Sequence, residues 1–381
     1  MTWGRRPTEV FRFSAEATAR IHSSRDLLRE LERARGVANH TQPSGFPLPF
    51  DPAELRKQVE RMASRLGVDP AQLGSPLGEF EGLEGVRFDD SSIYSTHPIL
   101  VRAMDMVGTL LRRTSAAETI PELGVVTHNS FNAAAVRYKK RLGASDSDVL
   151  VCNAVTIHYP VFWMVTDLCF ALCWLTTVWN QRGPEFARDH VIPEITRYVR
   201  AFRESLRNGT GQVPPFPPDS LEEDATYASC AVSSWVGATL AVMFVLLHEV
   251  AHVQLHFPSY VMAEQSDTCS MFCMTDTHRQ EFEADAFAAR HMKLLLPEEI
   301  YPVLKLNAEQ FSNALQLGLI GLFAAIDVFD TRGLLASLIP MPSHPSPHAR
   351  CYRVMEALGL SAADKRRARG MLVGFRALKA T

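Results

Sequence analysis

The sequence contains a five-residue run, His248-Glu249-Val250-Ala251-His252, whose residue types and spacing fit metal-dependent hydrolysis. On a helix, positions i and i+4 lie on one face, so both imidazoles can reach a single metal ion. Glu249 follows the first histidine and would point at the remaining coordination position, where a water would sit. The same run also fits a buried helix with two ordinary histidines. The residues that follow it in the sequence decide between the two interpretations.

A tetrahedral catalytic zinc needs a third protein ligand and keeps one position open. The nearer candidate is His256, four residues after His252 and on the same helical face. However, Phe257-Pro258 follow at once, and the residue before a proline is pushed out of helical geometry. We therefore interpret His256 as a histidine at the end of the helix, where the helix dipole favours it.

The better candidate is Glu281, because it lies on a separate helix. Residues 277–280, Thr-His-Arg-Gln, look like a capping box and predict a helix that starts there and stops before Pro297. Glu281 and Asp285 are four residues apart and share a face, so Glu281 can bind the metal while Asp285 holds an imidazole of His248 or His252. The alternative is an acidic, solvated helix face, which is how we interpret Glu283.

The pattern HExxH followed by E-F-x-A-D at residues 281–285 resembles the gluzincin metallopeptidases, and within them the HtpX and CAAX-prenyl-protease group. Two further segments match that group: residues 343–345, Ser-His-Pro, with Arg350 six residues after the histidine, and residues 131–134, Phe-Asn-Ala-Ala, which resemble an edge strand. The resemblance covers roughly residues 125 to 355. The same elements occur in soluble relatives such as the Lit-type phage-exclusion peptidases and the ImmA/IrrE-like regulators.

The resemblance implies a role for each of these positions. It implies a Zn2+ cofactor bound by His248, His252 and Glu281, with Asp285 supporting a histidine and Glu249 as general base. His344 would stabilise the oxyanion, with Arg350 either assisting it or bracing its loop. Asn132 and Ala133 would belong to a strand that binds an extended substrate by adding it to the edge of a sheet.

The predicted fold class is α+β and predominantly helical. We expect a zincin-like catalytic domain over residues 115–381, with a small sheet and an active-site helix pair, preceded by an N-terminal helical accessory region over residues 1–114. The expected helices include residues 14–36, 51–66, 98–113, 161–180 and 308–328, and the expected strands are 125–139 and 149–156.

Two apolar runs bear on whether the protein is located in a membrane. Residues 225–247 carry no charged side chain and are long enough to span a bilayer, yet their serines, threonines and glycine and their continuation into the HExxH run fit a buried helix. The run 161–179 is interrupted by Asp167. HtpX-like enzymes have several spanning helices, but we interpret both runs as core helices and expect no membrane location. Seven cysteines, mostly in apolar segments, favour reduced thiols and the cytoplasm, and the first twenty residues lack the apolar segment of a signal peptide.

The sequence therefore predicts a soluble zinc metalloendopeptidase, a hydrolase that cleaves a protein or peptide substrate in a regulatory, stress or phage-defence role. The formal net charge of −3 gives no reason to expect a nucleic-acid partner. The N-terminal region is a candidate surface for a regulatory protein. The alternatives are a catalytically silent zinc-binding scaffold and a membrane-associated HtpX-like quality-control protease. The sequence does not specify the substrate.

Overall fold

A computed structural model describes residues 13–36, 98–114, 120–126, 133–142, 149–208, 225–256, 278–300, 306–329 and 345–380. These residues are mostly helical with one small sheet, which confirms an α+β, predominantly helical fold. The helices before the metal motif are α1 (Ala15–Arg20), α2 (Ser24–Gly36), α6 (Pro98–Thr114), α7 (Tyr159–Arg182), α8 (Pro184–Phe186), the π-helical turn η3 (Ala187–Val191) and α9 (Ile192–Asn208). The later ones are α10 (Ala225–Ala251), the π-helical turn η5 (His252–His256), α12 (His278–Met292), α13 (Pro297–Ile300), α14 (Ala308–Phe329), α15 (Pro347–Leu358) and α16 (Ala362–Ala380).

The sheet has three strands in the order β1-β3-β2: β1 (Glu122–Val126), β3 (Val149–His158) and β2 (Ala133–Arg141). The strand β1 runs parallel to β3, and β2 runs antiparallel to it. The single strand that the sequence predicted over residues 125–139 is therefore two strands in the described residues. One continuous strand cannot pair with β3 in both directions, so the prediction of one strand was wrong.

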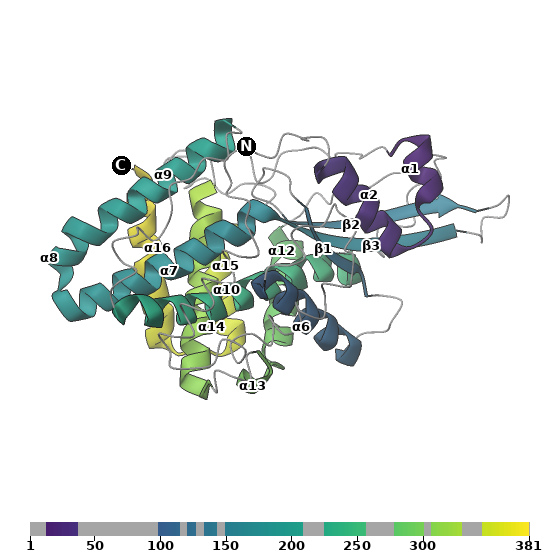
Figure 1. The fold of residues 1–381 in the computed structure, drawn as a ribbon. Coiled ribbons are helices and arrows are strands. Elements are labelled where there is room, and N and C mark those ends of the chain that lie inside the picture. The colour runs from purple at the N-terminus through teal and green to yellow at the C-terminus, as the bar shows by residue number, and fades with distance from the viewer. Residues whose placement is uncertain are drawn as a thin grey trace.

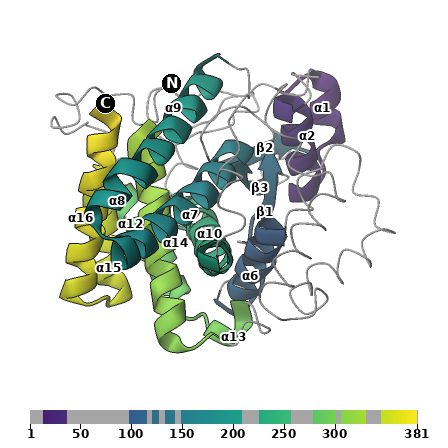
Figure 2. The same cartoon turned by 60° about the vertical axis from the view of Figure 1, so that its left-hand side comes forward.

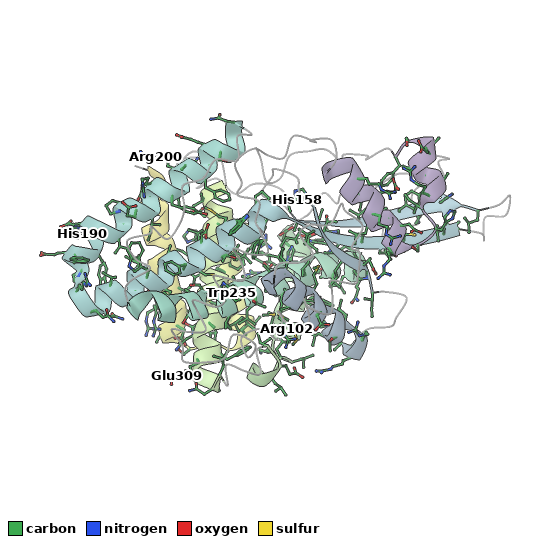
Figure 3. All side chains as sticks on the ribbon, in the orientation of Figure 1. Arg102, His158, His190, Arg200, Trp235 and Glu309 are labelled. Atoms are coloured by element: carbon green, nitrogen blue, oxygen red, sulfur yellow. The ribbon has the colours of Figure 1, made fainter. Side chains whose placement is uncertain are left out.

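Successive side chains of a strand point to opposite faces of a sheet, and both faces of this sheet carry apolar side chains that pack against helices. On one face, Val136 and Tyr138 of β2 and Ala154 of β3 pack against Leu27 and Leu31 of α2. Figure 1 shows α1 and α2 over this face of the sheet. The opposite face packs into the main core through Ala133, Ala135, Val155 and Ile157. Beyond the sheet, β3 passes directly into α7 at His158 (Figure 3).

The helix α10 lies at the centre of the main core. Every residue from Val236 to Ala251 is buried, and α10 packs against α6, α7, α12 and α14. Figure 2 shows α10 with α6, α7 and α14 around it. The backbones of α10 and α14 meet at Gly237 and Gly318, where a Cβ atom added to Gly318 would lie 2.1 Å from the carbonyl oxygen of Gly237. A helix that is enclosed in this way needs apolar residues all around it, which explains why residues 225–247 carry no charged side chain.

Three helical segments are long and apolar enough to cross a membrane by length and composition: Pro160–Arg182, Ser233–His256 and Ala308–Val328. In the second of them, 89% of the most apolar window is covered by the rest of the structure. The first is the least covered of the three, at 61%. This burial is what a core helix requires, and the absence of a membrane location stays a prediction.

The helix α6 packs against α10 and contributes Leu100, Ala103 and Val107 to the main core. Its Arg102 donates hydrogen bonds to the backbone carbonyls of Glu299 and Ile300, the latter at 2.7 Å, at the end of α13 (Figure 3). The described part of the N-terminal region thus supports the helix that carries the metal motif. The domain boundary at residue 114 stays a prediction.

Candidate metal centre

The two histidines of the motif lie where α10 ends and η5 begins. His248 is in the last turn of α10 and His252 is the first residue of η5. Both are buried, and their Nε2 atoms are 3.2 Å apart. The four-residue spacing therefore directs both rings to one point, as expected for residues on one face of a helix.

Glu281 completes the cluster from α12. Its Oε2 atom is 3.6 Å from His248 Nε2, and its Oε1 atom is 3.9 Å from His252 Nε2. Ligand atoms that lie about 2.0–2.1 Å from a tetrahedral zinc ion are themselves about 3.3 Å apart. The observed separations are close to that value, and the three residues form a buried His-His-Glu group that could hold a metal ion.

Asp285 and Arg350 surround the cluster on the other side of His248. Asp285 Oδ1 is 2.9 Å from His248 Nδ1, so it accepts the Nδ1 proton and leaves the lone pair of Nε2 directed at the cluster. Arg350, on α15, donates two hydrogen bonds to Asp285, at 2.8 and 2.9 Å, and its Nη1 lies 2.6 Å from Glu281 Oε2. A buried guanidinium therefore holds both carboxylates of α12 in place.

The pKa values of the two histidines are shifted in opposite directions. Burial disfavours the charged form of His248, but the hydrogen bond to Asp285 and the charge of Glu281 outweigh it and raise the pKa of His248. Burial, together with the nearby His248, lowers the pKa of His252 to about 3. His252 is therefore neutral at physiological pH, which is the form that binds a metal. Burial raises the pKa of Asp285, but the positive charge of Arg350 and the hydrogen bonds that Asp285 accepts lower it by more. The pKa of Asp285 is therefore below its usual value.

Glu249 is buried between this cluster and the sheet. Burial is the main reason that its pKa is raised, and the charge of Glu281 adds to the effect, while the charge of His248 opposes it. Its carboxylate also accepts a hydrogen bond from the backbone of Ala135 on β2. A carboxylate with a raised pKa is a stronger base, which suits the uptake of a proton from a water.

Of the other residues that the sequence singled out, His344 and Asn132 lie outside the described residues. Ala133 is the first residue of β2 and is buried in the main core, paired with Ile157. Arg350 is buried against Asp285 and Glu281, and its role toward His344 stays a prediction.

His256 is the last residue of η5 and Glu283 is an exposed residue of α12, as the sequence predicts, and the two residues also contact each other. His256 lies outside the three-residue cluster, but it is only 4% exposed, and its Nδ1 lies 2.8 Å from His252 Nδ1. Its Nε2 lies 3.1 Å from Oε2 of Glu283, whose side chain is 45% exposed, and this contact was not predicted. Two features of the sequence could have indicated this contact: a third histidine at the same four-residue spacing, and a glutamate two residues after Glu281. The contact of Ala135 with Glu249 had no signal in the sequence.

The fold and this site together define a mostly helical protein with a buried His-His-Glu group that could hold a metal ion, a composition found in zinc hydrolases. Residues 185–372, just under half of the chain, match the model of a family described as Peptidase U49. The matched region contains the whole His-His-Glu cluster and Arg350, and the match supports a peptidase. No curated protein and no solved structure matches the chain. The relation to HtpX or Lit-type enzymes stays a prediction.

Proposed function

We propose that this protein is a zinc-dependent endopeptidase that cleaves a protein or peptide substrate, with Glu249 as the general base. The observation that carries the proposal is the buried group of His248, His252 and Glu281, whose donor atoms lie 3.2 to 3.9 Å apart, near the spacing of ligands around a tetrahedral ion. The match of the surrounding region to a peptidase family supports the same reaction class. The assignment as a gluzincin rests on the HExxH and ExxxD spacing.

Each residue has a distinct task in this proposal. His248, His252 and Glu281 would hold the ion, and a bound zinc supplies acidity to a water and polarises a substrate carbonyl. Glu249 would take a proton from the attacking water and pass it to the leaving nitrogen, and a raised pKa suits this role. The burial of the site excludes bulk water, so these charges interact more strongly than they would at the surface.

The proposed substrate site is the outer edge of β2. This strand pairs with β3 on one side and has no strand on its other side among the described residues. The Ala135 backbone faces the Glu249 carboxylate, so this edge passes beside the proposed base. An extended peptide that adds to the edge would place its backbone next to Glu249.

We also propose a cytoplasmic location, a protein substrate rather than nucleic acid, and a regulatory, stress or phage-defence role. The cysteines of the described residues are free thiols, which supports a reducing compartment. The three apolar helices favour the membrane-associated alternative, and the two are separated by whether the full chain is extracted from cells without detergent. A partner for residues 1–114 is proposed on the sequence alone.

Glu249→Gln tests the proposed reaction. The variant keeps the size of the side chain and does not remove a metal ligand, so purified wild type and variant should both contain about one equivalent of zinc by elemental analysis. The variant should lose proteolysis by about 100-fold or more. New protein termini should therefore appear in cells that express wild type and not in cells that express the variant. Metal in both proteins with no new termini in either would favour the silent zinc-binding scaffold, and full activity of the variant would refute the proposed base.

A further inference from the structure

The second histidine of the cluster, His252, has its own chain of supporting residues, separate from the Asp285 contact of His248. Its Nδ1 atom lies 2.8 Å from Nδ1 of His256, and Nε2 of His256 lies 3.1 Å from Oε2 of Glu283. The two imidazole rings are 5.0 Å apart between centroids and tilted by 48°. His256 is buried, whereas the side chain of Glu283 is 45% exposed. The chain thus runs from the buried cluster to the protein surface.

The hydrogen positions in this chain follow from the atoms that meet. Only one proton fits between two nitrogens 2.8 Å apart, and it belongs to one ring or the other. If Nε2 of His252 is to offer a lone pair to a metal, the neutral ring must carry its proton on Nδ1. Nδ1 of His256 is then the acceptor, and the proton of a neutral His256 is on Nε2. That proton points at the carboxylate of Glu283, which accepts it.

Both hydrogen bonds of the series His252–His256–Glu283 run in the same direction, from His252 toward Glu283. Glu283 is the acceptor at its end, and its other oxygen, Oε1, lies 3.5 Å from Nε of Arg279. The reverse direction would require a proton on Nε2 of His252, which would block the nitrogen that faces the cluster. The arrangement therefore selects the form of His252 that can bind a metal.

The π-helical turn η5 places His256 beside His252 and outside the His248-His252-Glu281 cluster. The helix changes from α to π geometry at His252, and single π-helical turns of this kind are frequent at functional sites. His256 follows His252 by four residues, and its Nδ1 meets Nδ1 of His252, the ring nitrogen other than the Nε2 that lies near His248 and Glu281. The cluster's third donor comes from α12 instead.

We propose that His256 is a positioning residue that fixes the tautomer and ring orientation of His252, with Glu283 as the terminal acceptor of the chain. The inference rests on the proposed metal site and deepens it. His248 and His252 would then be supported differently, one by a carboxylate directly and the other by a carboxylate through an imidazole. Residues that orient metal-binding histidines in this way typically change metal affinity by 10–100-fold when they are replaced.

The test compares the Zn2+ affinity of the full-length metal-free protein and its variants by competition with a chromophoric chelator. His256→Leu removes the acceptor and should weaken Zn2+ binding by about 10–100-fold. His256→Asn places an amide oxygen near the position of Nδ1 and should restore most of that loss. Glu283→Gln, at a partly exposed position, keeps an acceptor without its charge and should weaken binding by only a few-fold.

The matched control is His291→Leu, because His291 lies ten residues after Glu281 on α12, about 15 Å along the helix, and contacts the carbonyl of Phe287. This variant should bind Zn2+ like the wild type. The visible spectrum of the Co2+-substituted protein gives a second measurement, because it reports the geometry of the ligands. His256→Leu should alter the spectrum, and His256→Asn should return it toward that of the wild type.

Equal Zn2+ affinity and equal Co2+ spectra for wild type and His256→Leu would overturn the inference. A His256→Asn variant no better than His256→Leu would also overturn it, because a purely structural role would then explain both losses. If His256→Leu does not fold, Glu283→Gln decides, and wild-type affinity in that variant overturns the proposal. A wild-type protein that binds no Zn2+ would instead refute the proposed function itself.

Discussion

Arg350→Met tests how the buried charges of this site are balanced. Arg350 is 4% exposed and is the shared partner of Glu281, at 2.6 Å, and Asp285, at 2.8 and 2.9 Å. Methionine fills much of the same volume but carries no charge, so both carboxylates lose a buried cation. Removing one partner of a buried ion pair typically costs about 3–5 kcal/mol, because the remaining charge is left uncompensated.

The expected change in melting temperature follows from the size of the chain. The entropy of unfolding is about 2.1 cal/mol/K per residue, so a chain of 381 residues has about 0.8 kcal/mol/K. A loss of about 3–5 kcal/mol then lowers the melting temperature of the metal-free protein by roughly 4–6 °C. Added Zn2+ would supply positive charge next to Glu281, so the difference between variant and wild type should narrow when the metal is present.

Differential scanning calorimetry of both proteins, with chelator and with excess Zn2+, measures the four melting temperatures. Arg353→Met is the matched control, since Arg353 is an exposed residue of the same helix that stacks on the ring of Phe282. It should change the melting temperature by no more than about 1 °C, as surface substitutions usually do. A melting temperature of Arg350→Met within 1 °C of the wild type, without metal, would refute the proposed balance of charges.

Two further predictions concern the core that positions the site. Gly318→Ala should lower the free energy of unfolding in urea by about 1–3 kcal/mol, because the new Cβ would lie 2.1 Å from the carbonyl oxygen of Gly237. The control Gly370→Ala, where no atom lies within 4 Å of the new Cβ, should be neutral or slightly stabilising. Equal stability of the two variants would contradict the close approach of α10 and α14. Burial raises the pKa of Asp167 from 3.8 to about 7, partly offset by the hydrogen bond from the Tyr198 hydroxyl. A carboxyl whose folded pKa is raised stabilises the fold fully at low pH and loses that contribution as pH rises through 7, so wild type should lose about 1–3 kcal/mol between pH 5 and 8 from this group. Asp167→Asn should remove this part of the pH dependence, and an identical pH dependence in both proteins would show that Asp167 does not titrate as inferred.

Much of the site was predictable because its spacing is local. A histidine at i and another at i+4 share a helical face wherever the helix lies, and the same holds for Glu281 and Asp285. The capping pattern and the proline also bounded α12 within a few residues. The apolar character of residues 225–247 predicted a helix enclosed on all sides, which is the position that α10 takes.

The sheet was less predictable because strand pairing depends on distant residues. Alternation of side chains identifies an extended segment, but it does not show which strand it pairs with or in which direction. The division of residues 125–139 into β1 and β2, on opposite sides of β3, therefore became evident only in three dimensions. The approach of Ala135 to Glu249 depends on that arrangement.

The sequence by itself determined the chemistry of the cluster, because residue type and helical spacing fix which donor atoms point in one direction. It selected His248, His252 and Glu281 and left His256 out of the cluster. The tertiary structure decided what surrounds those atoms. The packing of α15 on α12 brings Arg350 to both carboxylates, and the crossing of η5 and α12 brings His256 to Glu283. Contacts between segments far apart in the chain arise from packing, which local spacing does not encode.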